Sequence, residues 1–169
     1  MKKHTVMMVG MVSLICMASA AVYASTSDKD FVHEASVANE FEMEAGKITL
    51  EKSQDAEIKN FAQRMIDDHT KTAHKLTEAL HNSKKSHAQA TDKLDEKHQK
   101  IIKELEGTSG EEYEKLYIKE QIKAHKEAVS LFTDYSRNGE DPVLKEFATE
   151  TLPTLSEHLK HAKALNASR

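Results

Sequence analysis

Small and apolar side chains recur at intervals of three and four residues through four long segments of this sequence. A helix turns once in 3.6 residues, so this spacing places them along one face of each helix. Runs of β-branched residues and alternating polar and apolar stretches, which indicate strands, are nearly missing. Because a helix with one apolar face must bury it against another helix, the pattern predicts an all-α bundle.

Gly, Pro and capping residues set the ends of these segments. Ser27 or Asp28 is suited to cap the first helix and Ser53 the second, and Ser109 stands three residues before Glu112, as in a capping box. A shorter amphipathic helix is expected over residues 92–106, after a polar loop. The four long helices are expected over residues 29–52, 55–82, 110–137 and 142–165.

The connections between the helices limit their order. Helices of about 24 to 28 residues are about 36 to 42 Å long, the size of a four-helix bundle. Tight turns make the first two helices antiparallel neighbours, and likewise the last two. The middle connection, of about 27 residues, is long enough to cross the bundle as in ferritins. We therefore expect a ferritin-like four-helix bundle with a short extra helix in that connection, although an up-down-up-down order stays open.

The first residues have the pattern of a secretory signal. A basic start at Lys2 and Lys3 precedes a nearly continuous apolar stretch that ends in Val22-Tyr23-Ala24. This predicts a signal peptide over residues 1–24, cut after Ala24, and a single domain over residues 25–169 in the periplasm or outside the cell. An uncleaved anchor is the alternative, because the apolar stretch is just long enough to span a bilayer.

Charge and cysteine content exclude several classes of protein. The single cysteine, Cys16, would leave with the signal, so the remaining chain could form no disulfide. Losing Lys2 and Lys3 would change the formal net charge from -4 to -6. A nucleic-acid partner requires a concentrated basic face, which this balance argues against.

The inward face of each predicted helix is apolar or small except at one place, which holds a larger polar side chain. Glu42 interrupts it in the first helix, His69 in the second, Gln121 with His125 in the third and His158 in the fourth. The full inward rows are Phe31, Ala35, Ala38, Glu42, Ala45 and Thr49; Ile58, Ala62, Met65, His69, Thr72 and Leu76; Ile118, Gln121, His125, Ala128 and Phe132; and Leu144, Ala148, Thr151, Leu155, His158 and Ala162. At 1.5 Å per residue, all the interruptions fall about 17 to 28 Å along a bundle about 40 Å long, whichever order the helices take.

A divalent metal would explain one carboxylate and three imidazoles at one buried level. Burying such groups without partners costs several kcal/mol. Imidazole and carboxylate ligands suit Zn, Cu, Fe or Mn. The predicted ligands are Glu42, His69, His125 and His158. Outside them, we expect Gln121 to act as a donor or weak ligand and Asp68 to orient the His69 imidazole.

Two hypotheses without a metal remain open. Glu42 could form a buried ion pair with a protonated His69, which would fix the register of the helices. The protein would then be a structural or interaction module of the cell envelope, whose outer faces bind an envelope protein.

Four stretches of the sequence resemble a known family. EMEAG, FAQRMIDDH, QIKAH and LPTLSEHLKHAKAL are similar to a bacterial family of secreted ferritin-like proteins, the domain of unknown function DUF 4142, whose members are often labelled outer-membrane proteins. The resemblance extends from Asp30 to Leu165 and implies a ferritin-like fold. It places the family's motif residues at Glu42, His69, His125 and His158 and implies no particular activity.

The pattern of diiron enzymes is missing. Those bundles carry Glu-x-x-His on two helices, whereas Ile66, Ile122 and Leu155 stand three residues before the three histidines here. No nucleophile elbow, phosphate-binding loop or HExxH motif is present either. The sequence favours a metal-binding protein of envelope stress or metal handling over an enzyme, with a second copy or an envelope protein as the partners left open.

Overall fold

The computed structural model describes residues 26–169, and the predicted signal peptide and its cleavage point lie outside this range. The described part of the chain contains helices and no strands, which confirms the all-α class. Its helices are α1 (Asp28–Lys52), α2 (Ala56–Asn82), α3 (Glu96–Gly107), α4 (Gly110–Asn138) and α5 (Pro142–Ala167).

Short polar side chains begin most of these helices. The Ser27 hydroxyl accepts from the backbone N–H of Asp30, at 3.2 Å, and caps α1 as expected. Asp141 accepts two backbone N–H groups at the start of α5, where Pro142 occupies the first turn.

Other helix ends differ from the sequence prediction. Asp55, rather than Ser53, caps α2, because its carboxylate accepts from two backbone N–H groups of the first turn. Ser109 makes no side-chain capping bond, so the expected capping box with Glu112 is not formed. The short helix α3 begins at Glu96, several residues later than expected, because Asp95 supplies its cap.

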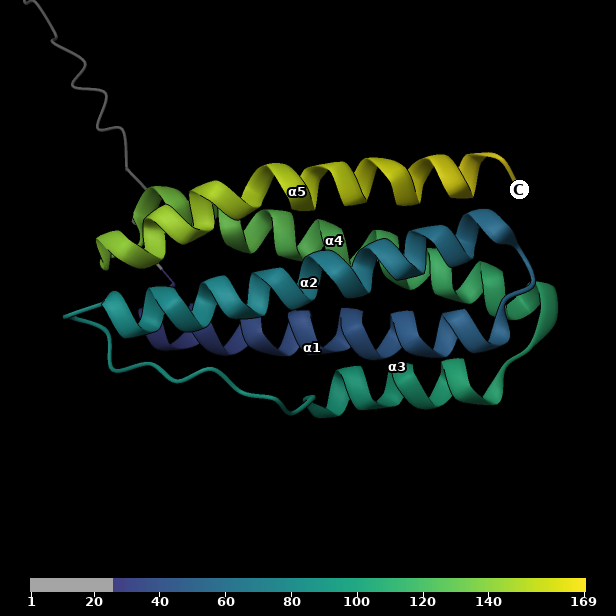
Figure 1. Ribbon diagram of the computed structural model, residues 1–169, viewed down its shortest axis with the longest axis horizontal. Helices are drawn as coiled ribbons and strands as arrows, with labels where there is room; N and C mark the ends of the chain where they lie inside the picture. The colour runs from purple at the N-terminus through teal and green to yellow at the C-terminus, as the bar shows by residue number, and fades with distance from the viewer. Residues whose placement is uncertain (1–25) are drawn as a thin grey trace, which may run out of the picture.

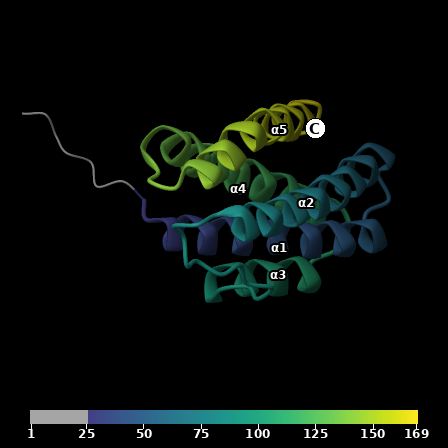
Figure 2. The same ribbon diagram turned by 60° about the vertical axis from the view of Figure 1, so that its left-hand side comes forward.

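The connection between α2 and α4 returns along the length of the bundle (Figure 1). As a result α4 begins at the same end as α2, and the up-down-up-down alternative is excluded. At the opposite end, the Ser83 hydroxyl after α2 donates to Asp141 before α5, at 2.5 Å, and the Tyr135 hydroxyl near the end of α4 donates to Asp28 in α1. Helix α2 packs on α5 and α1 on α4, while α3 lies outside the bundle against α1 and α4 (Figure 2).

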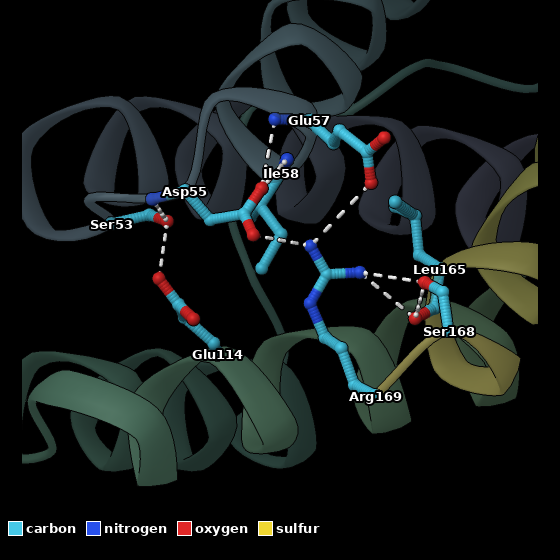
Figure 3. Close-up of polar contacts among 8 residues, drawn as sticks. All are labelled: Ser53, Asp55, Glu57, Ile58, Glu114, Leu165, Ser168 and Arg169. Atoms are coloured by element: carbon cyan, nitrogen blue, oxygen red, sulfur yellow. Dashed lines mark hydrogen bonds and ion pairs between the residues drawn. The ribbon is translucent and has the colours of Figure 1, made fainter.

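Polar contacts also join the end of the bundle where α1 turns into α2 (Figure 3). The Arg169 guanidinium donates to the Asp55 carboxylate, at 2.6 Å, and to the Leu165 carbonyl, at 2.9 Å. The Ser53 hydroxyl donates to Glu114 of α4, at 2.8 Å. The turn is thereby linked to α4 and α5, which holds the four long helices in register.

The core consists of two apolar clusters, one toward each end of the bundle. The cluster near the α1–α2 turn includes Phe41, Phe61, Met65, Tyr113 and Tyr117. The cluster near the opposite end includes Phe31, Leu76, Phe132, Tyr135 and Phe147. All of the predicted inward positions are buried except Ala38 and Thr72, which are partly exposed. Between the two clusters lies a level of buried polar side chains.

Within residues 26–169, every helix is too short or too polar to cross a membrane.

Gly46 permits the close approach of α1 and α2. A Cβ at this position would lie 2.8 Å from Cγ1 of Ile66 and 3.1 Å from the Ala62 carbonyl oxygen. Gly46→Ala should lower the free energy of unfolding by about 1 kcal/mol, because overpacking of about 1 to 3 kcal/mol outweighs a gain in helix propensity of about 1 kcal/mol. Urea unfolding measures the change.

Gly107→Ala is the matched control, since a Cβ there would meet no atom within 4 Å. This control should leave stability unchanged or slightly higher. If Gly46→Ala were as stable as Gly107→Ala, α1 and α2 would not be packed as closely as described.

Candidate metal centre

Three histidines from three helices meet at the middle of the bundle. His69 lies on α2, His125 on α4 and His158 on α5, with exposed fractions of 5%, 1% and 2%. Their ring centroids are 5.3 to 5.8 Å apart. One ring nitrogen of each lies within 4.8 Å of the other two, so the imidazoles converge as the inward positions predicted.

The second nitrogen of each ring has a hydrogen-bond acceptor. Nδ1 of His69 is 2.9 Å from Oδ1 of Asn39, and Nδ1 of His125 is 2.9 Å from the Gln121 carbonyl oxygen. Nε2 of His158 is 3.1 Å from Oδ2 of Asp68. These oxygens accept, so each of the three nitrogens carries the ring proton and donates it outward.

The remaining nitrogens of the rings have no hydrogen-bond partner. They are Nε2 of His69, Nε2 of His125 and Nδ1 of His158, all buried. Because the outer nitrogens hold the protons, these three present lone pairs. A buried acceptor without a donor costs about 1 to 3 kcal/mol, so the cluster is unfavourable unless something binds to it.

Burial also keeps two of these imidazoles, those of His69 and His158, neutral. It lowers the pKa of His69 well below 6.5, with further lowering from His125 and His158. Burial and His125 lower the pKa of His158 to about 4, although the Asp68 carboxylate acts in the opposite direction. Metal ions bind the neutral form of imidazole, so these two side chains need lose no proton near neutral pH.

Glu42 lies beside His125 but outside the group of three nitrogens. Its Oε1 is 3.6 Å from Nδ1 of His125, the outer nitrogen, and its Oε2 accepts from Nε2 of Gln121 at 2.5 Å. Burial raises the pKa of this carboxyl, and His125 and Gln121 counteract part of the rise. Within the described residues Glu42 pairs with His125 and forms no ion pair with His69, so the alternative of a Glu42–His69 ion pair is not formed.

The two predicted outer partners are both present, Gln121 as the expected donor and Asp68 with another partner than expected. Asp68 contacts His158 of α5 instead of orienting the neighbouring His69, and its carboxylate also pairs with Lys71. The Gln121 side chain holds Glu42, while its backbone carbonyl holds His125. Its Oε1 has no partner.

Two further buried polar groups, one at this level and one in the adjoining apolar cluster, were missed in the sequence. Asn39 is buried and holds His69; it stands four residues after Ala35 and three before Glu42, so spacing alone could have identified it. Tyr117 is fully buried, and its hydroxyl has no partner. Burial and then Glu42 raise the pKa of this tyrosine well above 10. Nothing in its sequence context distinguishes it from an ordinary core aromatic.

The donor set fits a divalent transition metal. Zinc binds imidazole nitrogen at about 2.0 to 2.1 Å and commonly takes three histidines with a further position left for water. Nitrogens within 4.8 Å of one another could reach such a distance with small movements of the rings. A water molecule has only two hydrogens to donate, so it would leave one of the three lone pairs unpaired.

The fold and the site thus define a helical bundle with a buried cluster of three histidines at its centre. The chain belongs to the family described as "Domain of unknown function (DUF4142)", whose model matches residues 16–165. No curated protein is significantly similar to the chain.

A solved structure, described as "CopM in the Cu(II)-bound form", shares the fold. The TM-score is 0.68 at 17% sequence identity, and the match covers 83% of this chain and 96% of that one. At this level of identity the likeness shows a shared fold, and the Cu(II) belongs to CopM.

Acid should destabilise the metal-free protein. Between pH 6.5 and about 4 the unfolded chain takes up a proton on His158 that the folded chain does not bind, so the free energy of unfolding falls as the pH falls. This residue alone corresponds to a loss of about 3 kcal/mol, and His69 acts in the same direction. Urea unfolding with chelator, at several pH values, measures the loss.

The contribution of His158 is isolated by comparing two variants. His158→Gln should reduce the pH dependence over this range, while His74→Gln, at an exposed position of α2, should leave it unchanged. Equal pH dependence in both variants would mean that His158 is protonated in the folded protein as readily as in the unfolded chain.

Proposed function

We propose that this protein binds one divalent transition-metal ion at mid-bundle through His69, His125 and His158. The observation that carries the proposal is a cluster of three buried histidines that offer ring nitrogens within 4.8 Å of one another, and in which each ring has a buried nitrogen without a hydrogen-bond partner. Each is on a different helix, and each ring is held from outside by an acceptor. Such outer acceptors fix the tautomer and orientation of metal-binding histidines.

Glu42 and Asp68 supply negative charge around the proposed ion. Their carboxylates lie next to the outer nitrogens of His125 and His158. Carboxylates in this position increase the basicity of an imidazole ligand. Glu42, expected from the sequence as a fourth ligand, is in this proposal an outer partner of His125, and the fourth position is left for water.

Copper is the first ion to test. Among divalent first-row metals, Cu(II) binds nitrogen ligands most tightly, followed by neighbours that include Zn. The shared fold with a protein solved with Cu(II) supports the same choice. Zn, Fe and Mn remain in the comparison because imidazole and carboxylate groups accept all of them.

We propose that the protein acts in the periplasm, either in metal handling or in the response to envelope stress. The support is the signal pattern that ends at Ala24 and the acidic charge of the rest of the chain. A bundle that binds one ion at its centre suits sequestration or carriage of the metal. Nothing in the site demands a chemical step on an organic substrate.

Metal should raise the melting temperature of the wild-type protein, and chelator should lower it. An ion that binds only the folded state stabilises it by about 2.7 kcal/mol at a hundredfold excess over Kd, or roughly 5 to 11 °C for a chain of this size. His69→Ala should abolish this response, because it removes one of three ligands. Melting curves with Cu, Zn, Fe or Mn, and with chelator, give the measurement.

His74→Ala is the control, since His74 lies on the same helix and is exposed. It should respond to metal as the wild type does. Glu42→Gln should still bind one ion, with affinity lowered by about 10 to 100-fold, as for other outer partners. A wild type indifferent to every metal would contradict the proposal and leave a polar network that only fixes helix register.

The mature protein should begin at Ser25 and occur in the soluble periplasmic fraction. The apolar stretch and the small residues before Ser25 motivate this prediction. N-terminal sequencing of protein from fractionated cells provides the test. Retention of Met1 in protein found only in membrane pellets would contradict it and support an anchor.

A further inference from the structure

A cavity of about 430 Å³ opens between α1 and α2 beneath the connection that follows α2. Its outer lining includes exposed Thr77, Ala90 and Asp92. Its inner lining includes Asn39 of α1 and Phe147 of α5, both buried. The cavity therefore leads from the surface into the bundle.

The inner end of this cavity reaches a residue that contacts the three-histidine cluster. Asn39 lines the cavity, and its Oδ1 is the acceptor for Nδ1 of His69. A second cavity, of about 330 Å³, lies beside α1 and α3 and contains none of the residues that hydrogen-bond to the histidines.

The lining of the first cavity suits a cation. It contains the carboxylates of Glu40 and Asp92 and the Met43 side chain, and it has no Lys, Arg or His. The second cavity mixes Lys97 and two histidines with its acidic groups. Low-dielectric walls that carry charge of one sign raise the local concentration of the opposite ion.

We propose that the divalent ion enters and leaves the cluster through the first cavity, past Asn39. The inference rests on the proposed metal-binding function and adds the path that the ion takes between solvent and the three histidines. Glu40 and Asp92 attract the ion at the mouth, and the Asn39 side chain lies where the route meets His69.

Filling the cavity tests the route without altering the cluster. Ala73 of α2 lines the cavity and is only partly buried, so Ala73→Phe should obstruct it. Because a route carries ions in both directions, the association and dissociation rates should both fall by at least about tenfold, with Kd unchanged. Stopped-flow mixing with CuCl₂, followed by tyrosine fluorescence, measures association, and transfer to a chelator measures dissociation.

Ala124→Phe is the matched control, because Ala124 lines the second cavity. Its rates should equal those of the wild type. Circular dichroism checks that both variants are folded.

A second variant keeps the test decisive if Ala73→Phe does not fold. Glu40→Lys with Asp92→Lys reverses the charge at the mouth and should slow association by about tenfold at low salt. Glu34→Lys with Glu140→Lys makes the same change in net charge at exposed positions outside the first cavity and should slow association much less.

The outcomes separate the route from the function. A wild type that binds no Cu, Zn, Fe or Mn would overturn both. If the wild type binds Cu, two results would overturn the route alone: rates in the cavity variants equal to those of the wild type, or equal slowing in the control variants.

Discussion

The outward hydrogen bonds of the three histidines determine what the centre of this bundle can do. Asn39, Gln121 and Asp68 each accept the ring proton of one imidazole, which leaves the other nitrogen as a lone pair without a hydrogen-bond partner. Three buried acceptors without donors, on rings whose centroids are 5.3 to 5.8 Å apart, are unfavourable unless something binds to them. A cation satisfies all three at once, whereas a water molecule has hydrogens for two.

This arrangement depends on the register of four helices. The cluster draws histidines from α2, α4 and α5, and the outer acceptors come from α1, α2 and α4. Apolar clusters above and below the polar level hold the helices, and polar contacts at both ends limit their sliding. A shift of one helix by one turn, about 5.4 Å, would separate its histidine from the others. The register of the helices thus holds the three proposed ligands together.

The spacing of residues in the sequence predicted the height of the site along the bundle, but it did not predict the contacts that the site residues make. Intervals of three and four residues identify which face of a helix turns inward, so His69, His125 and His158 could be placed at one height. The same rule does not reveal which neighbour each ring contacts, because that depends on helix rotation. Asp68 therefore contacts a histidine of α5 instead of its neighbour His69, and Glu42 lies at an outer nitrogen. The sequence could not decide the order of the helices. The connection between α2 and α4 is long enough to cross the length of the bundle, but its length alone also allowed an up-down-up-down order.

The most direct test of the three-histidine centre is anomalous diffraction from crystals of the protein loaded with Cu or Zn, recorded at the absorption edge of that metal. We predict one strong anomalous peak inside the bundle, within bonding distance of Nε2 of His69, Nε2 of His125 and Nδ1 of His158. No peak at this point, or a peak only at surface histidines, would contradict a metal centre built from these three residues.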